Sequence, residues 1–92
     1  MNFRERVRNG IKFLNSKYGR VWRKKVDLDS LDLRISCNCV LGQLEGSYTA
    51  GVNKWNLSTP GAEGFGFGFF LEDASYEQWN RLTDTWKREI TR

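Results

Sequence analysis

The sequence contains no histidine, and its only two cysteines, Cys37 and Cys39, are one residue apart. Without histidine, a single chain cannot form the Ser-His or Cys-His pairs that activate nucleophiles in many hydrolases. A structural zinc site needs about four Cys or His ligands, so one chain cannot build that either, although a dimer could share its cysteines. A disulfide across so short a loop is unfavourable, and we expect two reduced thiols, as in a cytosolic protein.

Long apolar runs are also missing. No stretch reaches the roughly 18 apolar residues that a transmembrane helix requires. The first ten residues, MNFRERVRNG, alternate charged and apolar side chains and lack the apolar centre of a signal peptide. Neither HExxH nor a P-loop occurs. We therefore expect a cytoplasmic protein with no membrane contact, no enzyme activity and no cofactor.

Three closely spaced aspartates, Asp27, Asp29 and Asp32, raise the question of a bound metal ion. An EF-hand loop needs glycine at its sixth position and glutamate at its twelfth. Counted from Asp27, those positions hold Asp32 and Asn38. The motif fails, and we expect these carboxylates to neutralise neighbouring cations or to cap a helix. We expect no metal site.

The periodicity of apolar residues predicts three amphipathic helices in a chain of 92 residues, a length typical of one domain. The first covers residues 3–18 and stops at Gly19; the last begins at Ser75, whose spacing from Gln78 fits a capping box. The central helix is expected from residue 37 to residue 55, with Ser36 as its N-cap. We predict a mainly α, single-domain fold of three packed helices.

Two segments leave a short β element open. Residues 26–29 alternate apolar and polar side chains, and residues 64–70, GFGFGFF, alternate glycine with phenylalanine. These segments could pair as two short strands. Alternatively, the glycine-rich segment is an irregular loop whose phenylalanines cover the helical core.

Positive charge is concentrated at the start of the chain. Residues 1–25 contain nine Lys or Arg and one acid, whereas residues 26–92 contain six basic and ten acidic residues. Such a basic segment can bind nucleic acid, an acidic protein or an anionic surface. It can equally be a solvated helix face, or pack against the acidic remainder of its own chain.

The candidate contact residues combine these cations with two aromatic residues. Trp22 lies among four cations and could stack on a base, or fill the core while its neighbours reach the solvent. Phe67 could be an exposed anchor for a partner or a core residue. The full set is Arg4, Arg8, Lys12, Arg20, Trp22, Arg23, Lys24, Lys25 and Phe67.

The segments VDLDSLDL (26–33) and CVLGQLEGSY (39–48) resemble a pattern shared by small uncharacterised proteins of phages and prophages of actinobacteria and related Gram-positives. The resemblance extends to Gly64-Phe65 and to LTDTWKREI at 82–90, and so covers about residues 20–92. The Gly-Phe repeat and the strongly basic first helix depart from it. The resemblance implies a phage accessory protein; it implies no activity.

The expectation from sequence is a phage protein that binds a host protein in the cytoplasm of the infected cell and inhibits or redirects it. A host-defence factor, such as a CRISPR or other anti-phage component, is the expected target, with an acidic or nucleic-acid-binding surface facing the basic helix. The alternative is a nucleic-acid-binding protein that uses the basic helix on phosphates. The sequence leaves the oligomeric state open, a homodimer included.

Overall fold

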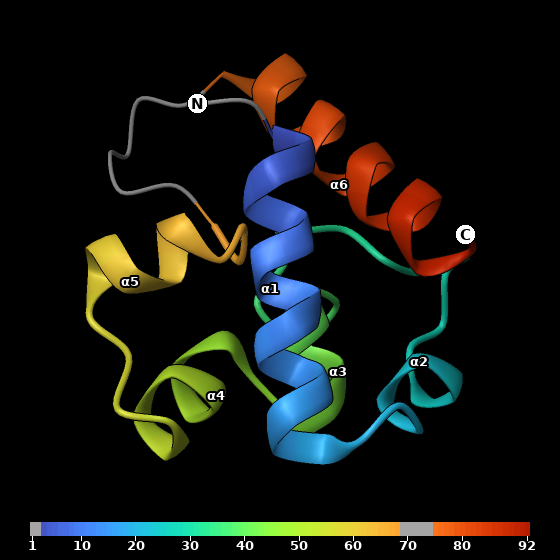
Figure 1. The fold of residues 1–92 in the computed structure, drawn as a ribbon. Helices are drawn as coiled ribbons and strands as arrows, with labels where there is room; N and C mark the ends of the chain where they lie inside the picture. Colours follow the sequence, from blue (N-terminus) through green and yellow to red (C-terminus); the bar gives the residue numbers. More distant parts are fainter. Residues whose placement is uncertain (1–2, 69–74) are drawn as a thin grey trace.

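The computed structural model describes residues 3–68 and 75–92 of the chain. Over these residues the fold has six helices and no strand (Figure 1). The helices are α1 (Phe3–Tyr18), α2 (Trp22–Lys25), α3 (Val40–Glu45), α4 (Tyr48–Lys54), α5 (Thr59–Gly64) and α6 (Tyr76–Ile90). The prediction of a mainly α fold is confirmed, but the helices are more numerous and shorter than expected.

Helix α1 has the bounds that the sequence predicted, helix α6 begins at the predicted cap Ser75, and the two long helices pack against each other (Figure 1). Helix α1 buries an apolar stripe that includes Val7 and Leu14, and α6 buries Leu82 and Trp86. At the start of α6 the Ser75 hydroxyl accepts a hydrogen bond from the Gln78 amide, and the Gln78 side chain accepts one from the Ser75 amide. The predicted capping box is therefore present.

Close contact between α1 and the segment after α5 depends on Gly10. A Cβ atom at this position would collide with the carbonyl oxygen of Phe65 and crowd the Trp86 ring. The Trp86 indole in turn donates a hydrogen bond of 2.6 Å to the Gly66 carbonyl. The glycine thus lets the 65–67 segment lie between the two long helices.

The predicted central helix is interrupted. Helix α3 ends at Gly46, whose φ of 98° is unfavourable for residues with a side chain. Ser47 then caps α4, because its hydroxyl accepts a hydrogen bond from the Ala50 amide at 3.0 Å. The helical spacing of apolar residues continues across residues 40–55. Gly46 at the end of α3, followed by Ser47 as the N-cap of α4, nevertheless divides this region into two helices.

The start of the central region also differs from the prediction. Cys39, not Ser36, caps α3, since its thiol accepts a hydrogen bond from the Gly42 amide. The Ser36 hydroxyl instead accepts one from the Tyr48 amide at 3.0 Å. Both cysteines are free thiols, and burial raises the pKa of the Cys39 thiol.

The suggested β element is not formed by the described residues. Residues 26–39 form turns, in which the carboxylates of Asp27 and Asp32 accept hydrogen bonds from amides two residues later, those of Asp29 and Arg34. The proposed partner strand was residues 64–70. Residue 64 is the end of a helix, residues 65–68 form turns, and residues 69–70 lie outside the described residues. Within residues 3–68 and 75–92, every helix is too short or too polar to cross a lipid bilayer.

Candidate functional site: a basic surface

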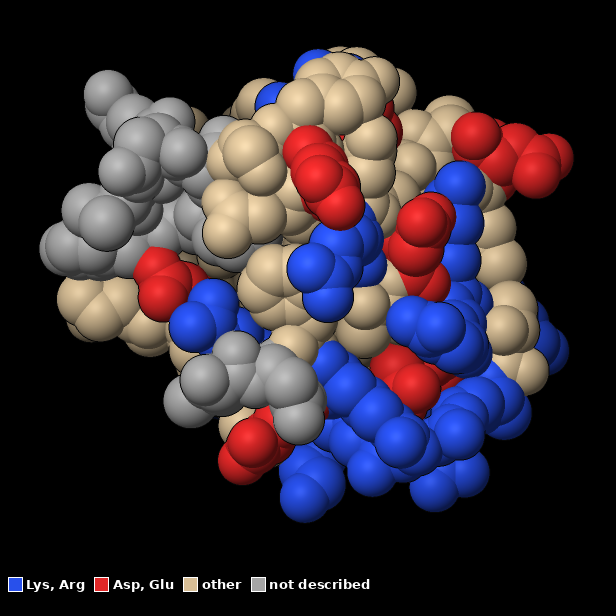
Figure 2. Space-filling model, turned by 90° about the horizontal axis from the view of Figure 1, so that it is seen from above, with Lys and Arg blue, Asp and Glu red and all other residues tan. Residues whose placement is uncertain are grey.

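Burial of one face of α1 exposes its cations on the other. Val7, Ile11 and Leu14 face the core, so Arg4, Arg8 and Lys12, four residues apart on another face, are exposed to solvent. Figure 2 shows lysines and arginines gathered along its lower edge, the side on which α1 faces the solvent in Figure 1. This is the arrangement that the sequence predicted for the first helix.

A carboxylate from α6 holds several of these cations together. The Glu89 side chain is only 5% exposed, and one oxygen accepts a hydrogen bond from the Arg8 guanidinium at 3.1 Å. The other oxygen lies 3.8 Å from Arg4 and 3.7 Å from Arg92. Glu89 therefore places three arginines, two from α1 and one from the C-terminus, around one buried charge.

The arginines also determine the charge of Glu89. Burial alone would raise the pKa of this carboxyl, because it disfavours the charged form. The hydrogen bond from Arg8 and the charges of Arg92, Arg8 and Arg4 outweigh burial and hold the pKa below its ordinary value. Glu89 is thus ionised at neutral pH, and the cluster of three arginines and one carboxylate keeps a net positive charge.

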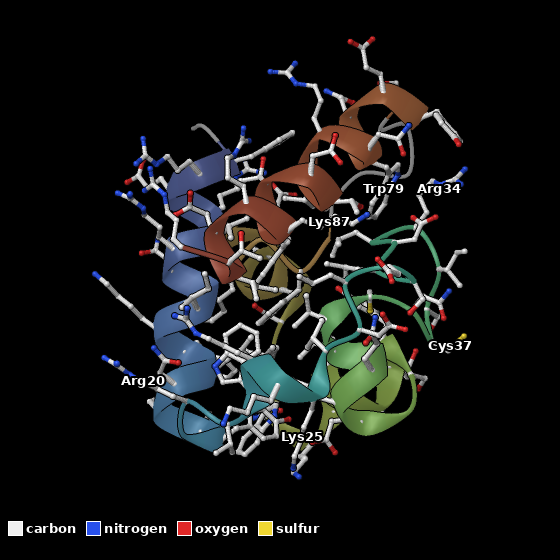
Figure 3. All side chains as sticks on the ribbon, turned by 90° about the vertical axis from the view of Figure 1, so that its right-hand side faces the viewer. Arg20, Lys25, Arg34, Cys37, Trp79 and Lys87 are labelled. Atoms are coloured by element: carbon white, nitrogen blue, oxygen red, sulfur yellow. The ribbon has the colours of Figure 1, made fainter. Side chains whose placement is uncertain are left out.

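Helix α2 extends this surface at the C-terminal end of α6. The Arg23 guanidinium donates a hydrogen bond of 3.3 Å to the Ile90 carbonyl, one of the last in α6. Arg20 lies at the end of α1, on the side where α1 faces the solvent (Figure 3). The name "basic surface" here means Arg4, Arg8, Lys12, Arg20, Arg23 and Arg92.

The remaining predicted cations do not all join this surface. Lys24 is exposed on α2. Lys25 lies at the far end of α2 (Figure 3). The hydrogen bond from the Tyr18 hydroxyl is the main cause of the lowered pKa of the Glu45 carboxyl, and the charges of Lys54 and Lys25 lower it further. Among the described residues, no ion pair within 4.0 Å involves Lys12, Arg20 or Lys24.

The two aromatic candidates are in the core. Trp22 has an exposure of 0% and packs edge-on to Trp86, and its indole donates a hydrogen bond to the Asn15 side chain at 2.8 Å. Phe67 is 1% exposed and stacks on Trp86 with ring centroids 5.7 Å apart. The assignment of these residues to a contact surface was wrong, because both rings fill the space between α1, α2 and α6. The alternative interpretation, core packing, is confirmed.

Sequence reasoning missed Glu89 and Arg92. Nothing near Glu89 in the sequence indicates that it pairs with Arg8 and Arg4, which lie 81 and 85 positions earlier in the chain. The spacing of Glu89 and Arg92, three residues apart, was the one local signal.

Two hollows border the basic surface. One of about 600 Å³ lies between the first turn of α1 and α6, where the Arg81 guanidinium stands 5.9 Å from the Phe3 ring centroid. A second, of about 400 Å³, lies on α1 itself, lined by Arg4, Glu5, Arg8, Asn9 and Lys12. Both are open and lined with charge, and so suit an anionic group at a surface more than an enclosed small molecule.

Comparisons with protein-family models, with curated proteins and with solved structures gave no match to this chain.

Proposed function

We propose that this domain is a phage accessory protein that acts by binding an anionic macromolecule on its basic surface, and that this macromolecule is nucleic acid. The observation that supports nucleic acid most directly is the composition of the surface, which is rich in Arg and Lys from α1, α2 and the end of α6. Phosphates are contacted mainly by such side chains. The phage origin rests on the sequence resemblance alone.

Burial of Trp22 and Phe67 bears on the choice of partner. The hypothesis of a host-protein target assigned these rings as anchors, and protein interfaces usually depend on a few buried aromatic or arginine side chains. With both rings in the core, the exposed groups of the site are cations. That change favours nucleic acid over the host-protein partner expected from the sequence.

One observation still favours a host protein, including a defence factor, as the second candidate. Glu89 orders three arginines, and ordered guanidinium groups pair well with carboxylates of an acidic partner. In this version the domain would inhibit or redirect its target by covering an acidic surface. The two candidates therefore use the same cations on different partners.

The test compares two double variants with equal loss of charge. In the first, Lys12→Gln and Arg20→Gln remove two cations of the basic surface that form no ion pair within 4.0 Å with any other described residue. In the control, Arg34→Gln and Lys87→Gln remove cations that Figure 3 places away from the α1 side. Binding to a labelled oligonucleotide is followed by fluorescence anisotropy.

We expect the first variant to bind roughly tenfold more weakly than the control, because each phosphate contact contributes separately. Equal weakening in both variants would mean that only net charge matters and would refute the assigned surface. If wild type fails to bind oligonucleotides but retains one host protein from a nuclease-treated lysate, the second candidate replaces the first.

A further inference from the structure

A cluster of partly exposed aromatic rings lies beside the basic surface, where α5 runs past the middle of α1. Phe13 on α1 and Phe65, directly after α5, stack with ring centroids 4.7 Å apart and planes 29° apart. Trp55 meets Phe13 edge-on at 6.2 Å. All three rings are half-buried, so part of each remains accessible.

Two of these rings, Phe13 and Phe65, line an open hollow of about 560 Å³, together with Asn9, Lys12, Gly61 and Gly64. Its lining is mostly apolar, since two of these residues are phenylalanines and two are glycines without side chains. A Cβ atom added at Gly64 would meet no other atom within 4 Å. The side of the hollow formed by Gly64 is therefore unobstructed.

This aromatic hollow adjoins the charged hollow on α1, because Asn9 and Lys12 line both. Lys17 stands on the other side of the rings, with its ammonium 5.7 Å from the Phe13 centroid and 5.4 Å from the Trp55 centroid. The carboxylates nearby are Glu5, which lines the charged hollow, Glu63, which pairs with Arg6 at 3.4 Å, and Glu45. Glu45 pairs at 3.1 Å with Lys54, whose ammonium is 5.2 Å from the Trp55 centroid. Cations therefore flank the rings on two sides.

Single-stranded nucleic acid is the partner whose chemistry this arrangement fits. Proteins that bind single strands combine a positively charged path for the phosphates with aromatic rings on which bases stack. In a duplex the bases are already stacked on each other, and their faces cannot reach such rings. An apolar side chain of a protein could also fill the hollow, but it would offer no anionic group to Lys12 and Lys17.

We propose that the Phe13–Phe65 hollow holds an unpaired base of a single-stranded nucleic acid whose phosphates lie on the adjacent cations of α1. Phe65 supplies the stacking surface, Lys12 and Lys17 contact the flanking phosphates, and the Asn9 amide can donate to and accept from a base edge. This inference rests on the proposed function, because it names the kind of nucleic acid that the basic surface binds.

The test compares two probes with the same number of phosphates, a short oligothymidylate and an abasic strand of equal length. Stacking of one base typically changes affinity by about 5- to 150-fold. Wild-type protein is expected to prefer the oligothymidylate by a factor in that range.

Two variants remove the stacking site in different ways. Phe65→Leu keeps an apolar side chain but removes the flat ring, and Gly64→Leu adds a side chain where the hollow is open. Gly64→Ala, which adds one carbon, is the matched control. Thermal unfolding of all three variants verifies that each is folded before binding is measured.

We expect both leucine variants to bind the two probes equally, and the alanine control to keep most of the preference. If wild type binds both probes with the same affinity, the stacking site is refuted, while nucleic-acid binding by the basic surface survives. If wild type binds neither probe, the proposed function itself fails. A preference that persists in both leucine variants would place base recognition elsewhere on the protein.

Discussion

Glu89 organises the basic surface at the scale of single residues. It is a buried carboxylate whose partners, Arg4, Arg8 and Arg92, come from both ends of the chain. Removing the charge would leave three arginines without the group that fixes their positions. The cluster therefore contributes both to folding and to the geometry of the surface.

We predict that Glu89→Gln lowers the free energy of unfolding by about 1.5–3 kcal/mol at pH 7, the usual range for a hydrogen bond to a charged group. The arginines hold the pKa of Glu89 below its ordinary value in the folded state. Its stabilising effect is therefore present above the pKa of unfolded glutamate, about 4.3, and is lost as pH falls through the lower folded value. Urea unfolding at neutral and at acid pH measures the effect.

The control for this prediction is Glu77→Gln, the same substitution at an exposed position of α6. The difference between wild type and Glu89→Gln should shrink on acidification, while the Glu77→Gln variant should stay close to wild type throughout. A difference that is the same at both pH values would show that Glu89 stabilises the fold by packing and not by charge.

At the scale of elements, sequence periodicity was a good guide to the long helices and a poor one to the central region. The stripes of α1 and α6 and the capping box at Ser75 are local features, so both helices could be predicted almost to the residue. The sequence also contains a signal for the break between α3 and α4, since Gly46 followed by Ser47 is a typical helix end and helix start. The apolar stripe continues across this signal, and for that reason a single helix was predicted.

Substitution of Gly46 by alanine distinguishes one continuous central helix from two helices that are separated at Gly46. In a continuous helix, Gly46→Ala would stabilise the protein by about 1 kcal/mol. At a φ of 98° the same change is strained, and we expect it to destabilise the protein by about 1 kcal/mol or more. The Tm from thermal unfolding should fall.

The matched control is Gly64→Ala, since Gly64 is the last residue of α5 and an added Cβ atom would meet no other atom within 4 Å. That variant should be as stable as wild type or more so. A rise in Tm for Gly46→Ala would contradict the break between α3 and α4.

At the scale of the whole molecule, the sequence indicated that the cations of α1 share one face, but neither that Arg92 joins them nor what holds or borders the surface. Arg4, Arg8 and Lys12 follow from the period of one helix. The meeting of Arg8 with Glu89 and of Phe13 with Phe65 depends on how α1 packs against α6 and α5. The glycine-phenylalanine repeat is ambiguous for the same reason: Phe67 is buried against Trp86, whereas Phe65, two residues earlier, is half-exposed beside α1.

The measurement that tests the central claim most directly is the salt dependence of binding to a single-stranded oligonucleotide, for wild type and for the variant with Lys12→Gln and Arg20→Gln. If the basic surface binds phosphates, the logarithm of the affinity falls linearly with the logarithm of salt concentration, by roughly 0.7 for each phosphate neutralised on a single strand. We predict a steep slope for wild type and a slope smaller by roughly 1.4 for the double variant. A shallow slope, or one that the double variant shares with wild type, would contradict the account.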